Sequence, residues 1–97
     1  MAFVFEVADK SGRKIHLSKK QWSHIRKKHP EVEELNWVKE AVQIPDKITS
    51  YEFDETIYYY YKFHKHRKFP AKYFKVSVKY LNGEGYVLTS YFGRNIK

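Results

Sequence analysis

The chain has 97 residues, which suffices for one domain with a two-layer core and leaves no room for a second independent domain. It contains no cysteine, which excludes a disulfide framework, a thiol nucleophile and a zinc site built on sulfur. Its net charge of +8 favours a polyanionic partner such as nucleic acid, although it also fits a solubilising surface without any partner.

The first residues predict a β-hairpin. Phe3 to Val7 alternates as a strand does, Asp9-Lys10-Ser11-Gly12 has the composition of a turn, and Lys14 to Leu17 predicts a second short strand. The opening run lacks the basic region of a signal peptide and the length of a membrane span. We therefore expect a soluble, cytoplasmic protein with no membrane partner.

A helix follows the hairpin. Ser18 is a suitable N-cap, with Gln21 at the capping-box position, and we expect the helix to run to about Lys28. In helical projection, Ile25 and His29 share one face with Trp22. Lys20, His24, Lys27 and Lys28 fall on the other face. Pro30 breaks the helix, so His29 is expected where the core-facing stripe meets a helix end.

A second helix is predicted to begin at Pro30, whose missing amide is tolerated in a first turn. The acids that follow would favour the positive end of its dipole, and Ile44-Pro45-Asp46 would end it. Its apolar stripe comprises Val32, Leu35, Val38 and Val42. Trp37 lies off this stripe, and either packs under a neighbouring loop or stays partly exposed.

After Asp46, the apolar residues follow the period of two that is typical of β-strands. The predicted strands are Lys47 to Phe53, Thr56 to His64, Tyr73 to Tyr80 and Gly85 to Phe92, with a turn at Asp54-Glu55 and a basic loop from Lys65 to Lys72. The second of these strands holds four consecutive tyrosines, Tyr58 to Tyr61, so both of its faces carry aromatics. We expect one face in the core and the other toward a ligand or solvent.

Asn82-Gly83 is the strongest hairpin signal, because both residues tolerate the positive φ of a type I′ turn. A strict two-residue turn pairs Leu81 with Glu84, Val78 with Val87, Val76 with Thr89 and Phe74 with Tyr91. Thr89 and Tyr91 would then lie on the apolar face. The predicted fold is α+β, with an N-terminal hairpin and two helices packed on one face of a four-stranded antiparallel sheet, in a single domain spanning residues 1–97.

Charge is segregated along the chain. Residues 10–30 and 56–83 contain no acid, whereas most acids lie between Glu31 and Glu55. If the fold joins the two basic segments, their cations and aromatics form a surface suited to RNA. Magnesium chemistry needs clustered carboxylates, and no such pair stands out on the basic strands, so we expect no metal and no cofactor. His16, His64 and His66 could bind a soft metal, but H-x-H in a charged loop is commonly just solvated.

From Ile15 to the C-terminus, the sequence resembles the phage-type branch of the barnase, EndoU, colicin and RelE-like nuclease superfamily. The matching pieces are I-H-L-S-K-K-Q-W-S-H-I, K-H-P-E, A-V-Q-I-P-D-K-I, the Tyr-rich strand, K-V-S-V-K-Y and G-Y-V-L-T-S-Y. The resemblance implies a metal-independent, toxin-like endoribonuclease whose polar residues come from the first helix and the last strands. It matches His24 and His29 to the family's helix histidines and Thr89 with Tyr91 to its T-x-Y. One departure is that no glutamate is placed as a base on these strands.

The candidate catalytic residues are therefore His29, Thr89, Tyr91 and His24. The candidate RNA-binding residues are Arg94, Lys75, Lys79, Lys62, Arg67 and Lys28. Each has a plainer interpretation: His29 as a helix-capping core residue, His24 as a solvated or phosphate-contacting residue, and Thr89 and Tyr91 as packing residues. A non-catalytic RNA-binding module and a protein-interaction domain for an acidic partner, such as an antitoxin or regulatory protein, remain alternatives.

Overall fold

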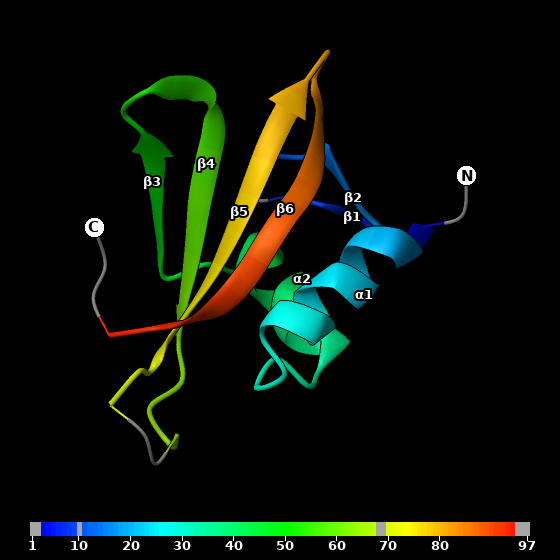
Figure 1. The fold of residues 1–97 in the computed structure, drawn as a ribbon. Helices are drawn as coiled ribbons and strands as arrows, with labels where there is room; N and C mark the ends of the chain where they lie inside the picture. The colour runs from blue at the N-terminus through cyan, green and yellow to red at the C-terminus, as the bar shows by residue number, and fades with distance from the viewer. Residues whose placement is uncertain (1–2, 10, 68–69, 95–97) are drawn as a thin grey trace.

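The computed structural model describes residues 3–9, 11–67 and 70–94 (Figure 1). Its elements are β1 (Phe3–Ala8), β2 (Lys14–Ser18), α1 (Lys19–Lys28), α2 (Leu35–Gln43), β3 (Lys47–Tyr51), β4 (Asp54–Phe63), β5 (Tyr73–Leu81) and β6 (Glu84–Gly93). Lys10 of the predicted turn and Lys68 of the predicted basic loop lie outside the described residues. Neither helix in the described part is long and apolar enough to cross a membrane.

The sheet has six strands in the order β1-β2-β6-β5-β4-β3, so the predicted four-stranded antiparallel sheet is wrong. The N-terminal hairpin is part of the sheet, because β2 pairs in parallel with β6 through Ile15 with Gly85 and His16 with Tyr86. All other neighbouring strands are antiparallel. Two residue pairs make this junction, and strand alternation in the sequence does not encode which strands become neighbours.

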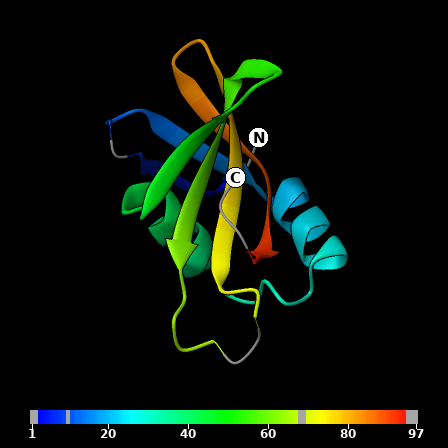
Figure 2. The ribbon, with the colours of Figure 1, turned by 90° about the vertical axis from the view of Figure 1, so that its left-hand side faces the viewer.

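The helices cover different parts of the sheet. Contacts join α2 to β4, β5 and β1, and join α1 to β6, β2 and β1. Figure 2 shows the two helices at opposite sides of the view; both contact β1, while α2 also covers β4 and β5 and α1 covers β6 and β2. Ile25 of α1 and Val38 and Val42 of α2 are fully buried in one core with the apolar side chains of β5. The face of the sheet that the helices leave uncovered is called the outer face below.

Helix α1 begins and ends where the sequence predicts. The Ser18 hydroxyl accepts a hydrogen bond from the Gln21 amide at 3.1 Å, as expected of an N-cap. His29 is the C-cap, and its amide donates to the Ile25 carbonyl at 2.7 Å. Arg26, Lys27 and Lys28 occupy the last turn, where positive charge is favourable for the helix dipole.

Helix α2 begins at Leu35, so the prediction that it starts at Pro30 is wrong. The Arg26 guanidinium donates to the carbonyls of Pro30 and Val32, each at 2.9 Å, and holds this segment as a loop. Val32 is nevertheless fully buried, so its apolar character reflects the core and not a helical stripe. Trp37 packs at the edge of the core beside His64, where the loop after β4 begins.

The β3–β4 turn lies two residues earlier than predicted. Glu52 and Phe53 form the turn, and Asp54 already starts β4. The Asp54 carboxylate accepts hydrogen bonds from the amide and hydroxyl of Thr56, at 2.9 and 2.6 Å. These bonds, with one from Lys79, lower the pKa of Asp54 to about 2.

The β5–β6 hairpin contains a bulge that changes which side chains face outward. Asn82 and Gly83 both have positive φ, at 55° and 80°, as a type I′ turn requires. Val78 pairs with Val87 as predicted, but the register then shifts, and Ser77 pairs with Thr89. Leu88 is the extra residue.

Because the side-chain period of a strand is two, the bulge reverses the faces of the rest of β6. Ser90 and Phe92 are buried against the core, opposite Val76 and Phe74. Thr89 and Tyr91 take the outer face, opposite Ser77 and Lys75. The predicted pairs Val76 with Thr89 and Phe74 with Tyr91 are therefore wrong.

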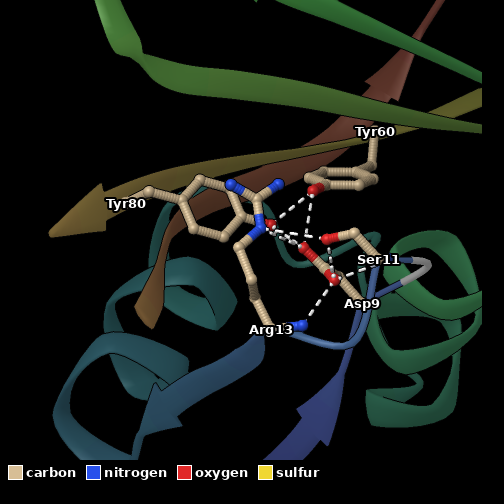
Figure 3. A network of polar contacts seen from close by, with 5 residues as sticks. All are labelled: Asp9, Ser11, Arg13, Tyr60 and Tyr80. Atoms are coloured by element: carbon tan, nitrogen blue, oxygen red, sulfur yellow. Dashed lines mark hydrogen bonds and ion pairs between the residues drawn. The ribbon is translucent and has the colours of Figure 1, made fainter. Parts of the chain in front are cut away.

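A buried carboxylate ties the β1–β2 turn to the centre of the sheet (Figure 3). Asp9 accepts hydrogen bonds from the Tyr80 hydroxyl at 2.6 Å and from the amides of Ser11 and Arg13, each at 2.9 Å. The Tyr60 hydroxyl is bonded to that of Tyr80, and the Arg13 guanidinium lies 3.8 Å from the centre of the Tyr80 ring. The carboxylate is thus fully engaged within the fold, which makes it an anchor and not a free reactive group.

Gly85→Ala should destabilise the protein by about 1–3 kcal/mol, the usual cost of overpacking a core. A Cβ at Gly85 would come within 2.8 Å of Val78 Cγ1 and 2.9 Å of Tyr80 Cε1, at the β2–β6 junction. Gly93→Ala is the matched control, because a Cβ there meets nothing within 4 Å. Urea unfolding of the three proteins measures the difference, and equal midpoints for the two variants would contradict the close packing of β5 and β2 side chains around Gly85.

The free energy of unfolding should decrease as the pH is lowered from about 4 to about 2, because Asp9 becomes protonated over this range. Burial alone would raise its pKa, but hydrogen bonds from Tyr80, Ser11 and Arg13 and the charge of Arg13 lower it from 3.8 to about 2. A depressed folded-state pKa stabilises the fold above the unfolded pKa, and this contribution, about 2 kcal/mol, disappears as the carboxylate protonates. Unfolding free energies measured from pH 5 to pH 2 should drop less steeply for Asp9→Asn than for the wild type.

Candidate functional site

The outer face carries tyrosines, hydroxyls and lysines from four strands. By the observed register its members include Lys47, Thr49, Tyr59, Tyr61, Lys75, Ser77, Lys79, Tyr86, Thr89 and Tyr91. The alternation of β5 explains this set, because Val76 and Val78 point into the core and leave Lys75, Ser77 and Lys79 on the other side. The C-terminal end of α1 lies beside β6, where the His29 ring stacks on the Tyr91 ring.

His29 reaches the outer face because α1 is fixed along β6. The Gln21 side-chain amide donates to the Leu88 carbonyl, the group at the bulge. One turn beyond Ile25, the His29 ring stacks on the Tyr91 ring, with 5.3 Å between centroids and 25° between planes. His29 Nδ1 lies 3.7 Å from a carboxylate oxygen of Glu31, and the side chain is 31 % exposed. The imidazole is thus oriented by an aromatic ring and still open to a ligand.

Lys75 lies next to this pair, directly across from Tyr91 in the β5–β6 ladder. Its ammonium lies 3.9 Å from the centre of the Tyr59 ring and 5.5 Å from that of Tyr91. Aromatic faces attract a cation, so these rings hold the ammonium without neutralising it. Among the described residues, no carboxylate forms an ion pair with Lys75. Its charge is therefore available to an anionic ligand.

Burial raises the pKa of the Tyr59 hydroxyl, and the nearby charge of Lys75 only partly opposes this effect. Tyr59 therefore stays a neutral hydrogen-bond donor at neutral pH. Thr89 completes the group, opposite Ser77 on the neighbouring strand. The site thus combines a proton-transfer group, a cation and several neutral hydroxyls.

The structure brings together four of the residues expected from the sequence: His29, Thr89, Tyr91 and Lys75. Lys79 shares their face, but its ammonium is engaged by Asp54 at 3.0 Å. His24 and Lys28 are exposed on α1, and His24 lines a separate shallow hollow with Lys20 and Lys27.

Three other cations were expected to bind RNA, and none of their described contacts is with His29 or Tyr91. Lys62 is next to α2, where its ammonium donates to the Ile44 carbonyl at 2.9 Å. The Arg67 guanidinium carbon lies 3.6 Å from the centre of the Phe92 ring, near the C-terminal end of β6. Arg94 is an exposed residue directly after β6.

Lys62 lines a second hollow, of about 490 Å³, at the C-terminal end of β4. His64 and His66 are in its wall together with Glu40 and Asp46. Burial lowers the pKa of His64, and Trp37 meets its ring edge-on with 5.7 Å between centroids. In the described part of the chain, no group of three His, Asp or Glu side chains is arranged to hold a metal ion, here or elsewhere.

A groove of about 500 Å³ adjoins Lys75 and was not expected from the sequence. Its walls are Thr49, Ser50, Tyr51, Glu52, Tyr59 and Lys75, from the β3–β4 hairpin and β5. From the run of four tyrosines we expected one face of β4 in the core and the other toward a ligand or solvent. However, the displaced β3–β4 turn concealed that Tyr51 and Glu52 would stand beside Tyr59.

Comparison with known proteins finds no family model, no curated protein and no solved structure that matches this chain.

The stack of His29 on Tyr91 should be detectable in solution. Tyr91→Leu removes the ring current that shifts the His29 ring protons, so their NMR signals should move toward those of an exposed histidine. Thr89→Val, on the same strand and face, should leave these signals nearly unchanged. Unmoved His29 signals in Tyr91→Leu would contradict the placement of α1 against β6.

Proposed function

We propose that this protein is a metal-independent, toxin-like endoribonuclease that cleaves RNA on the outer face of its sheet. The observation that supports this proposal is the meeting of His29, from the end of α1, with Tyr91 and Lys75 from the last two strands. An imidazole, an ammonium and hydroxyls are the groups that RNA transesterification needs from a protein.

In the proposed reaction, the ribose 2′-oxygen attacks the adjacent phosphorus, and the bond from phosphorus to the 5′-oxygen breaks. His29 accepts the 2′-hydroxyl proton and can return it to the leaving 5′-oxygen, so one imidazole balances the transfer. Lys75 offsets the extra negative charge on the phosphorane. The hydroxyls of Thr89 and Tyr91 orient the phosphate, and the products end in a 2′,3′-cyclic phosphate and a 5′-hydroxyl.

The surroundings of the site suit RNA as the substrate. Tyr59 and Tyr91 flank Lys75, so bases could stack where the backbone meets a cation. The net charge of +8 favours association with a polyanion. An acidic protein, such as an antitoxin or regulatory subunit, would be attracted to the same charge and would inhibit by covering this face. With cellular RNA as substrate, the expected compartment is the cytoplasm.

Cleavage should be tested with end-labelled single-stranded RNA in EDTA. The wild type should release fragments with cyclic phosphate ends, and His29→Ala should lower the rate by roughly 100-fold or more, the usual contribution of a general acid or base. His24→Ala is the matched control, because His24 is the other histidine of the same helix and lies on its exposed face. If no RNA of varied sequence and structure is cleaved, the nuclease proposal fails.

A non-catalytic RNA-binding module is the second candidate. The observation in its favour is that Lys75 is surrounded by tyrosine rings, an arrangement that holds single strands without any chemistry. RNA binding that weakens steeply with salt, unaffected by His29→Ala and accompanied by no cleavage, would favour this candidate.

A further inference from the structure

The groove beside Lys75 continues the outer face toward the β3–β4 hairpin. Lys75 belongs to both regions, because it lines the groove and its ammonium lies 5.5 Å from the Tyr91 ring centre. A nucleotide chain whose phosphate meets Lys75 would therefore reach the groove with its next base. The volume of about 500 Å³ is within the range of sites that bind small organic ligands.

The groove offers aromatic rings for stacking. Tyr51 and Tyr59 line it, with 5.9 Å between their centroids and 59° between their planes. Tyr51 is 37 % exposed, and Phe53, which meets its edge at 5.5 Å, is 78 % exposed. Exposed aromatic rings beside a free cation are typical of surfaces that stack unpaired bases.

Its polar groups differ from those around His29. Glu52 lines the groove, and no described residue forms an ion pair with its carboxylate. The Thr49 hydroxyl oxygen is buried in the same wall and has no hydrogen-bond partner among the described residues.

A carboxylate accepts hydrogen bonds and cannot donate them. Cytosine, adenine and guanine carry exocyclic amines that donate to such an acceptor. Uracil has no amine, and two carbonyl oxygens flank its only ring N–H, so a carboxylate at this edge repels it. Cytosine and uracil have nearly the same size, which makes the charge at Glu52 the element that separates them.

We propose that this groove binds an unpaired nucleobase next to the phosphate held by Lys75, and that Glu52 selects an amine-bearing base over uracil. The inference rests on the proposed function to the extent that single-stranded RNA is the ligand. It needs no cleavage, because binding in the groove uses none of His29, Thr89 or Tyr91.

The test is fluorescence anisotropy with labelled hexamers of 2′-fluoro cytidine and of 2′-fluoro uridine, which lack the 2′-hydroxyl and cannot be cleaved. The wild type should bind the cytidine hexamer about tenfold more tightly, the discrimination expected of one or two base-edge contacts. Glu52→Gln should bring the two affinities to within about twofold, because an amide both donates and accepts. Tyr51→Ala should weaken both hexamers by a similar factor of roughly ten, as the loss of one stacking partner does.

Glu55→Gln is the matched control, because it makes the same change of charge close by on the same hairpin but does not line the groove. It should keep the wild-type discrimination. His29→Ala should keep it as well, while losing any cleavage of ordinary RNA.

The outcomes separate the two proposals. Wild-type protein that cleaves RNA but binds both hexamers equally would overturn the groove and leave the nuclease proposal intact. Discrimination that depends on Glu52, in a protein that cleaves nothing, would support the groove and overturn the nuclease. Discrimination that survives in Glu52→Gln, or binding of neither hexamer, would overturn the groove assignment.

Discussion

The bulge at Leu88 is the constraint on which the outer face depends. One additional residue in β6 places Thr89 and Tyr91 outside and sends Ser90 and Phe92 into the core. At the bulge, the Gln21 side chain donates a hydrogen bond from α1 to the Leu88 carbonyl. This hydrogen bond holds α1 against β6, and a helix held there brings His29 onto Tyr91.

The N-terminal strands β1 and β2 hold this arrangement in place through their contacts with β5 and β6. The parallel pairing of β2 with β6 sets where α1 starts, since Ser18 ends β2 and caps the helix. Close packing around Gly85 fixes that junction, and the buried Asp9 ties the β1–β2 turn to Tyr80 of β5. A site assembled from a helix end and two strands stays precise only if these supports do not shift.

Charge on the outer face is divided between engaged and free groups. Lys79 is paired with Asp54, whereas Lys75 is held by tyrosine rings and has no described carboxylate partner. Glu52, in turn, is an acid that lines the groove in a protein of net charge +8. This polarity suits a ligand with an anionic backbone and a hydrogen-bond-donating base. The two proposals share Lys75. Beyond it, the nuclease proposal depends on His29, Thr89 and Tyr91, whereas the groove proposal depends on Tyr51, Tyr59 and Glu52.

The sequence by itself determined the local features of this protein: the Ser18 cap, the helix stop at His29, the type I′ turn at Asn82-Gly83 and the β-prone segments. These depend on neighbours a few residues apart. Only the tertiary structure decided the six-stranded order, the loop from Pro30 to Glu34 and the side on which Thr89 and Tyr91 lie. The physical reason is that a strand's face depends on the parity of its register, and the bulge that changes this parity is stabilised by Gln21, a residue far from Leu88 in the chain.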